Sequence, residues 1–340
     1  MALPVIIDCD PGTDDALALL LALGSPALDV RAITVAGGNA GLDRTLANAR
    51  AIIGLTGADV PVYAGADRPL LGRFHDEARV HGADGLAGVE LPPGPPAAPG
   101  VAADAIRTLL RAADAPITLI GLAPCTNFAL ALATEPALAR AVGAIVLMGG
   151  AWGEGNATPA AEFNALGDPE ALAILLGLGV PVTLAVLEVT SQVLATPARL
   201  AALEQDALAI ARSSCSSSLS GRVIQTSGDA ASGHHAPGEG PGRALAAARA
   251  IQGRVPPSRR MGGAGAPLHD PCAVAFVIAP SLFHGRALPV WVECTPGAGR
   301  GRTHIDRWGR SGRLVTATVL EEVDEDGVFA LLAAALARLP

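Results

Sequence analysis

Two kinds of apolar segment alternate along the chain, short runs rich in β-branched residues and longer segments rich in Ala and Leu. A short run bounded by turn residues is typical of a buried strand, and an Ala- and Leu-rich segment of ten or more residues is typical of a helix. The predicted strands span residues 5–8, 30–36, 117–121, 144–149, 180–189, 288–294 and 314–320. The predicted helices span residues 14–23, 43–57, 101–113, 126–140, 168–177, 197–212, 270–280 and 327–338.

This alternation predicts βαβ units, and therefore an α/β fold in which helices cover both faces of a mainly parallel sheet. No Pro-rich or charge-rich linker divides the 340 residues. We therefore expect a single large, doubly wound domain over residues 1–340. Residues 228–260 are rich in Gly, Pro and Ala, and we expect a mobile lid or insert over residues 213–262.

Polar segments follow several of the predicted strands, where a doubly wound sheet forms its ligand crevice. These segments are DCDPGTDD (8–15), GGN (37–39), APCTN (123–127) and GGAWGEGN (149–156). A further polar segment, GAPLHD (265–270), leads into the helix predicted from residue 270. The carboxyl ends of the strands are therefore the expected location of a functional site.

Four aspartates, Asp8, Asp10, Asp14 and Asp15, gather at the first strand end. A helix N-terminus stabilises a carboxylate by typically 0.3–1 kcal/mol, whereas two like charges about 4 Å apart repel by roughly 4 kcal/mol at an effective dielectric of 20. Either some of these acids are protonated or a cation lies among them. Carboxylates without a nearby His or Cys favour a hard cation, calcium or magnesium. A helix cap flanked by solvated carboxylates is the simpler alternative.

Composition limits the cellular location and the classes of binding partner that we expect. The formal net charge of -8 argues against a nucleic-acid or anionic-membrane partner. The five cysteines lack CxxC spacing and predict neither a zinc site nor a disulfide framework, as is typical of a cytoplasmic protein. The N-terminus MALPVIID lacks the basic region of a signal peptide, and the apolar run over 16–23 is shorter than the roughly 20 residues that span a bilayer.

The segment DCDPGTDDALALL resembles the signature of the nucleoside hydrolases, the inosine-uridine preferring N-ribohydrolase family. Further segments resemble this family in the same order: TVAGGNAGLDRTLANA (34–49), HGADGLAG (81–88), GLAPCTN (121–127), MGGAWGEGNATPAAEFNALGDPEA (148–171), GAPLHDPCAVA (265–275) and GRGRTHIDRWG (299–309). The resemblance covers nearly the whole chain. It implies calcium-dependent hydrolysis of the N-glycosidic bond of ribonucleosides, which releases a free nucleobase, and a homodimer or homotetramer.

The resemblance also implies a role for individual residues. The calcium ligands would be Asp10, Asp15, the backbone carbonyl of Thr126, and Asp270. Asp10 would be the general base for the attacking water, and His269 would protonate the departing base. The expected substrate-binding residues are Asp14, Asn39, His81, Asn156, Glu162 and Asn164. Of these, Asn156 and Glu162 would reach toward the 5′-hydroxyl, and His81 would lie near the base.

Two other functions remain open at this stage. A DxD sequence after a first strand also begins the haloacid-dehalogenase phosphatases, although here Pro11 separates Asp10 from the Gly-Thr pair. A ribonucleoside-binding protein without turnover is the second alternative. No Phe, Tyr or Trp lies between Asn164 and Ala275, so a choice between purine and pyrimidine is not predicted and weak discrimination among bases is expected. His234 and His235, in the expected lid, are candidates for contact with the base or with solvent.

Overall fold

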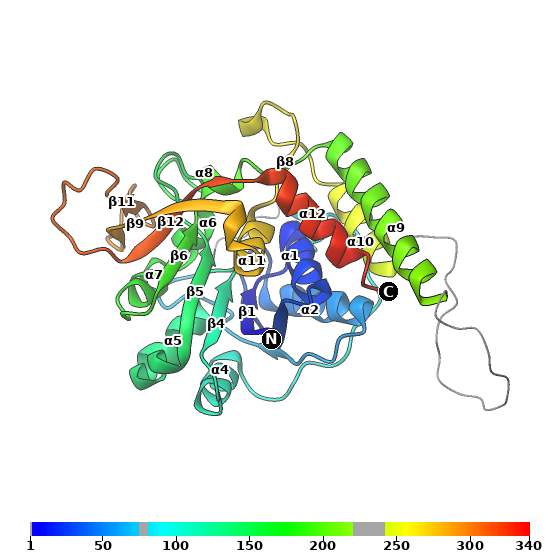
Figure 1. The fold of residues 1–340 in the computed structure, drawn as a ribbon. Coiled ribbons are helices and arrows are strands. Elements are labelled where there is room, and N and C mark those ends of the chain that lie inside the picture. Colours follow the sequence, from blue (N-terminus) through cyan, green and yellow to red (C-terminus); the bar gives the residue numbers. More distant parts are fainter. Residues whose placement is uncertain (1, 75–80, 220–241) are drawn as a thin grey trace.

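The computed structural model describes residues 2–74, 81–219 and 242–340, and its centre is an eight-stranded sheet with the order β3-β2-β1-β4-β5-β6-β12-β9 (Figure 1). Neighbouring strands pair in parallel except at the edge, where β9 runs antiparallel to β12. The strands are β1 (Leu3–Cys9), β2 (Leu28–Val35), β3 (Val62–Ala64), β4 (Ile117–Gly121), β5 (Val142–Met148), β6 (Val182–Ala185), β9 (Phe283–Leu288) and β12 (Ala317–Val323). The predicted mainly parallel α/β sheet is confirmed.

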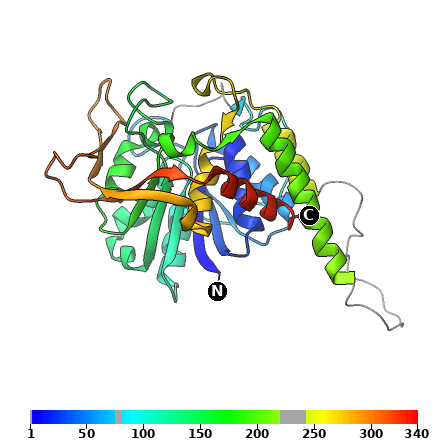
Figure 2. The ribbon, with the colours of Figure 1, turned by 45° about the horizontal axis from the view of Figure 1, so that its top comes forward.

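Helices cover both faces of this sheet. On one face α1 packs against α2, α10, α11 and α12, and on the other α5 packs against α4 and α7; Figures 1 and 2 show the two groups. The helices are α1 (Thr13–Gly24), α2 (Leu42–Thr56), α4 (Ala102–Arg111), α5 (Thr126–Thr134), α6 (Phe163–Gly167), α7 (Pro169–Leu176), α8 (Leu187–Thr190), α9 (Pro197–Leu219), α10 (Arg243–Gln252), α11 (His269–Ile278) and α12 (Glu325–Leu336). No helix of the described part of the chain is long and apolar enough to cross a membrane.

The first strand and the first helix form the centre of the core. Residues 5–9 of β1 are fully buried between β2 and β4, as expected of a strand covered on both faces. In α1, residues 16–22 are all buried, and the helix is apolar around its whole circumference because it packs against α2, α10, α11 and α12 as well as against the sheet. The turn between β1 and α1 is therefore held rigidly at the carboxyl edge of the sheet.

Two predicted strands are shorter than expected. The segment predicted over 180–189 forms β6 and then the one-turn helix α8. The segment predicted over 288–294 is divided at Pro289, because Leu288 ends β9 in the main sheet and Val290 begins β10 (Val290–Val292), which pairs with β11 (Thr303–Ile305). Proline lacks the amide hydrogen that a continuous strand would need at this point.

The expected lid over 213–262 is only partly described. Residues 220–241, with His234 and His235, lie outside the described residues. The described remainder contains the end of α9, the helix α10, and a 3₁₀ turn, η2 (Arg259–Met261). A two-residue pairing of β7 (Leu194–Ala195) with β8 (Ala266–Pro267) follows. The mobility of this segment stays a prediction.

Candidate active site

A cavity of about 770 Å³ lies at the carboxyl ends of the central strands and contains most of the predicted site residues in its wall. The predicted residues in its lining are Asp14, Asn39, His81, Asn156, Glu162, Asn164, His269 and Asp270. Three others, Asp10, Asp15 and Thr126, are buried in the same strand-end region. Segments as far apart as 13–14 and 266–270 therefore meet around one chamber, as the parallel sheet predicts.

Asp8 is the one carboxylate in β1, and it lies buried next to the site. Its Oδ1 accepts hydrogen bonds from the Thr34 hydroxyl (2.6 Å) and from Nδ2 of Asn127 (2.8 Å). Burial raises the pKa of Asp8 to about 7, although these two hydrogen bonds oppose the shift. Asp8 therefore links β1 to β2 and to α5, and it is not in the cavity lining.

Asp10 is fully buried, and the loop after β2 holds one of its two oxygens. Oδ2 accepts a hydrogen bond of 2.7 Å from the backbone amide of Asn39, while Nδ2 of Asn39 donates to the Asp10 carbonyl (3.2 Å). Oδ1 is buried and has no hydrogen-bond partner among the described residues. Burial, followed by the charge of Asp15, raises the pKa of Asp10 well above its ordinary value. A buried carboxylate oxygen without a partner is costly unless a cation or a proton satisfies it.

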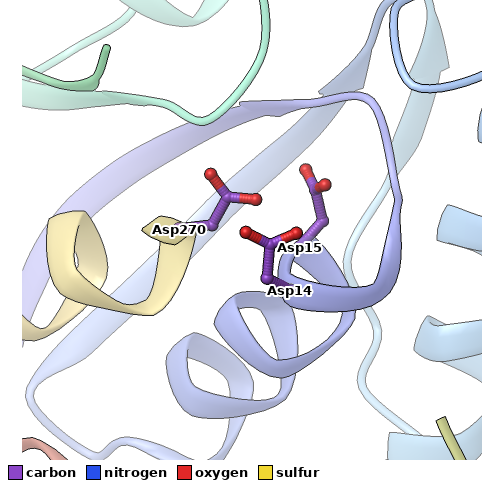
Figure 3. A group of neighbouring side chains, drawn as sticks. All are labelled: Asp14, Asp15 and Asp270. Carbon is purple, nitrogen blue, oxygen red and sulfur yellow. The ribbon is translucent and has the colours of Figure 1, made fainter. Parts of the chain in front are cut away.

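Asp14, Asp15 and Asp270 form an acidic cluster between the start of α1 and the start of α11 (Figure 3). One carboxylate oxygen from each lies within 4.8 Å of the others. Asp15 accepts hydrogen bonds from the Gly12 amide (2.9 Å) and from Nδ2 of Asn39 (3.1 Å). Burial raises the pKa of Asp15 to about 7, with the charge of Asp14 as the next cause, and burial likewise raises that of Asp270.

Asp15 and Asp270 are also close enough to share a hydrogen bond. Two ionised carboxylates cannot share one, so this contact requires a proton or is replaced by a common cation. The close Asp15–Asp270 pair and the unpartnered Oδ1 of Asp10 together provide carboxylate oxygens that suit a hard divalent cation. Thr126, the remaining predicted ligand, is buried at the start of α5 after the neighbouring strand β4. The ligand roles stay predictions.

Glu162 and Asn164 shape the opposite wall. Glu162 caps α6, because its Oε1 accepts from the Asn164 amide (2.8 Å) and its Oε2 accepts from the Ala165 and Gly150 amides (both 2.9 Å). Burial raises the pKa of Glu162, although these amides lower it. Nδ2 of Asn164 donates to the carbonyls of Leu122 (2.8 Å) and Met148 (3.1 Å), at the ends of β4 and β5. Both side chains are thus fixed before a substrate arrives.

Two histidines, His81 and His269, line the cavity. Nδ1 of His81 accepts a hydrogen bond of 3.1 Å from the Thr13 amide, so in the neutral ring Nε2 carries the hydrogen. Nδ1 of His269 lies 2.6 Å from the Thr190 hydroxyl, which leaves Nε2 available to a substrate. Burial lowers the pKa of both rings, and the charge of Asp14 opposes it.

The remaining wall of the cavity lies within the lid expected over residues 213–262, although none of its residues was named as a site residue. Residues 255–259, sequence VPPSR, line it together with Phe163, which is the aromatic residue in this lining. Phe163 lies between Glu162 and Asn164, so its neighbours in the sequence were a usable signal. The segment 255–259 has no apolar periodicity and follows a helix that was not predicted, so no local pattern indicated its position.

The chain can be compared as a whole with known protein families. The pattern of the inosine-uridine preferring nucleoside hydrolase family matches residues 5–330, and the chain belongs to this family. The predicted resemblance is confirmed, and the dehalogenase-like phosphatase and the binding protein without turnover are left without support.

The names of similar proteins agree on ribonucleoside hydrolysis and differ in the nucleobase that is preferred. The chain is 38% identical over 339 residues to a protein of Shewanella woodyi named pyrimidine-specific ribonucleoside hydrolase RihA, covering 99% of this chain and 98% of the relative. It is 38% identical to the protein of the same name from Citrobacter koseri, covering 99% of both. A purine-preferring ribonucleoside hydrolase from Gardnerella vaginalis has a similar structure, with a TM-score of 0.79 and 29% identity, over 98% of this chain and 99% of that one. A plant nucleoside hydrolase aligns with a TM-score of 0.81 and 28% identity over 99% of both chains.

Proposed function

We propose that this protein hydrolyses the N-glycosidic bond of ribonucleosides in a calcium-dependent reaction, releasing ribose and the free nucleobase. The observation that carries this proposal is the acidic cluster of Asp14, Asp15 and Asp270 together with Asp10, whose buried Oδ1 has no partner among the described residues. The cluster lies at the strand ends where the predicted ribose-binding side chains also converge. Carboxylates beside the sugar favour this reaction because the sugar carries positive charge in the transition state.

The proposed calcium ligands are Asp10, Asp15, Asp270 and the carbonyl of Thr126. A calcium ion held there would offset the repulsion among the acids and supply Lewis acidity toward water and the ribose hydroxyls. Asn39 orients two of the ligands, because it donates to Oδ2 of Asp10 and to Oδ2 of Asp15. We infer that loss of Asn39 would weaken cation binding as well as ribose binding.

Asp10 is the proposed general base. The backbone amide of Asn39 holds Oδ2 in place, and this hydrogen bond would keep the carboxylate oriented toward the cation and the attacking water. In the absence of a cation, burial raises the pKa of Asp10, and a bound calcium ion would keep the carboxylate ionised and able to accept a proton. Asp14 lines the cavity beside it and is the proposed partner of the ribose 2′-hydroxyl.

His269 is the proposed proton donor to the departing base, through Nε2. Its Nδ1 is engaged by Thr190, so the ring is held in one orientation. Burial lowers the pKa of His269, which makes the protonated ring a stronger acid but less populated at neutral pH. The proposed roles of the other residues are ribose contacts by Asn39, Asn156, Glu162 and Asn164 and contact near the base by His81.

The base-side wall supports weak discrimination among bases. Val255, Pro256 and Pro257 are apolar, and Phe163 offers one ring. Apolar contacts of this kind separate similar ligands by only about 1–3 kcal/mol, whereas buried polar groups that lose a substrate hydroxyl discriminate more steeply. The chain's relatives include a pyrimidine-specific and a purine-preferring enzyme. We infer that both classes of riboside are substrates, and we retain a cytoplasmic homodimer or homotetramer as part of the proposal.

The test is release of free base from inosine, adenosine, guanosine, uridine and cytidine by the calcium-loaded enzyme, with 2′-deoxyuridine compared with uridine. We expect kcat/KM to vary less across the five bases than it falls on loss of the 2′-hydroxyl. Chelation should abolish turnover, and calcium should restore it. A preference among bases larger than the 2′-hydroxyl effect would contradict the inferred breadth, and full activity after chelation would contradict the calcium requirement.

A further inference from the structure

Residues 253–261 form a strap along one side of the cavity, the side proposed to receive the base, and an arginine near each end binds a neighbouring loop. At one end Arg254 donates to the carbonyl of Gly88, in the loop that follows His81. At the other end Arg260 donates to the carbonyls of Glu154 (2.7 Å) and Gly155 (3.0 Å). Residues 255–259, between the two arginines, line the cavity.

The loop that Arg260 contacts carries a predicted substrate residue. Asn156 directly follows Gly155 and lines the cavity. Its Oδ1 accepts a hydrogen bond of 2.9 Å from the Phe163 amide, so the side chain is oriented and its Nδ2 remains to donate.

The same loop has a second anchor on its other side. The Glu188 carboxylate accepts from the amides of Gly153 (2.7 Å) and Trp152 (3.3 Å). Arg260 therefore completes the hold on residues 152–156, because it binds the two carbonyls that lie between the Glu188 contacts and Asn156. The Gly155 amide donates to the Pro159 carbonyl (3.2 Å), so Arg260 holds the carbonyl side of a loop whose other contacts lie within residues 155–161.

We propose that Arg260 is a positioning residue for the ribose 5′-hydroxyl: it fixes residues 154–155 so that Nδ2 of Asn156 meets this hydroxyl. The proposal rests on the proposed function, in which Asn156 binds the ribose. Because the same strap forms the proposed base-side wall, Arg260 also connects this wall to the loop that carries Asn156. The residue acts through backbone carbonyls and need not touch the substrate.

The contact depends on the geometry of arginine. A planar guanidinium can donate two roughly parallel hydrogen bonds to neighbouring acceptors, whereas a lysine ammonium acts as a single point charge. Arg260→Lys should therefore reach one of the two carbonyls and keep only part of the effect. Arg249, in α10, provides a matched control, since its contact is an exposed ion pair with Glu204 outside the cavity lining.

The first experiment compares uridine with 5′-deoxyuridine, and inosine with 5′-deoxyinosine, in calcium-loaded wild type, Arg260→Ala, Arg260→Lys and Arg249→Ala. We expect Arg260→Ala to lower kcat/KM about tenfold on the ribosides, the equivalent of one hydrogen bond, and less than twofold on the 5′-deoxy analogues. Arg260→Lys should fall between, and Arg249→Ala should match wild type. An equal loss on both kinds of substrate, or no loss on either, would overturn the proposal.

A second measurement does not need turnover. Hydrogen exchange of the backbone amides should accelerate in residues 151–157 of Arg260→Ala, and not in Arg249→Ala, because the loop loses its anchor on the strap side. Unchanged exchange in this segment would overturn the proposed anchoring even if wild-type enzyme cleaved no riboside. A wild type that is inactive but shows the expected exchange would count against the proposed function alone.

Discussion

Gly38 determines how closely the loop after β2 can approach Asp10. A Cβ atom at this position would lie 1.9 Å from Oδ2 of Asp10, the oxygen that the Asn39 amide holds. No real contact is that short, so any side chain here must displace Asp10 or the loop. The absence of a side chain at residue 38 is therefore a requirement of the proposed base.

We expect Gly38→Ala to lower kcat/KM by about 10²-fold, the cost of moving a reacting group by roughly 1 Å, and to destabilise the fold by about 1–3 kcal/mol through overpacking. Gly41→Ala is the matched control, since a Cβ there has nothing within 4 Å and the backbone φ of -62° suits alanine. Base release and chemical denaturation measure the two effects. Similar behaviour of both variants would show that the backbone can relax around residue 38.

His269 is tested by changing the leaving group. If Nε2 protonates the departing base, His269→Ala should lower cleavage of inosine by about 10²–10⁴-fold and that of a nitrophenyl riboside far less, because a nitrophenolate leaves without a proton. Since burial lowers the pKa of His269 below 6.5, the wild-type rate on inosine should fall as pH rises through that lowered pKa. Steady-state rates on both substrates measure this, and an equal loss on both would indicate a structural role beside Asp270.

At the scale of elements, one ion pair joins the β10–β11 hairpin to α7. Arg300 donates from both terminal nitrogens to the two carboxylate oxygens of Glu170 (2.8 and 2.7 Å), and both side chains are mostly buried. The hydrogen bonds from Arg300 lower the pKa of Glu170 below its ordinary 4.5. A depressed carboxylate pKa contributes stability above the unfolded value, and this stability is lost as pH falls through the folded value.

Glu170→Gln should therefore lower the free energy of unfolding by about 1 kcal/mol at pH 7 and by nothing measurable once the pH is well below the folded pKa of Glu170. Urea denaturation at pH 7 and at successively lower pH, until the difference between the two proteins no longer changes, gives both values. In an Arg300→Ala background the same substitution should have little effect at either pH. If wild type and Glu170→Gln differed in free energy of unfolding by the same amount at every pH, the ion pair would not stabilise the hairpin.

The order of the central strands was predictable because a parallel sheet buries its strands on both faces, so that 117–121 and 144–149 are short, mainly apolar runs. The edge strand β9 was not, since the strand predicted over 288–294 shares only Leu288 with it. The three-residue strands β3 and β11 were not predicted, since so short a run has no period and forms only by pairing with a distant partner. The break at Pro289 was visible in the sequence and was overlooked.

The candidate site divides in the same way. The acids and amides at the strand ends were predictable because they follow strands directly, and the structure brings Asp14, Asn39 and Asp270 to one cavity. The residues of the base-side wall at 255–259 were not predictable. Their position depends on two contacts, of Arg254 with one loop and of Arg260 with another, and both loops are about a hundred residues or more distant in sequence. Such contacts leave no local pattern.

At the scale of the whole molecule, the acidic cluster couples cation binding to folding. In the absence of a cation, burial raises the pKa of both Asp8 and Asp15 from 3.8 to about 7. A carboxyl group with a raised folded pKa contributes its full stability below the unfolded value and loses it as pH rises toward the folded value. The cation-free protein should thus become less stable between about pH 4 and pH 7, while the unfolded chain is already ionised.

Calcium should remove this pH dependence, because a bound cation stabilises the ionised carboxylates that burial disfavours. We therefore expect the gain in melting temperature on adding calcium to chelator-treated protein to be small near pH 5 and to grow up to about pH 8. Thermal denaturation across this range, with and without calcium, measures the gain, and Asp15→Asn should reduce both the gain and its slope with pH. A gain that is constant across the range would show that Asp8 and Asp15 are ionised without a cation, and that their burial does not create the requirement for one.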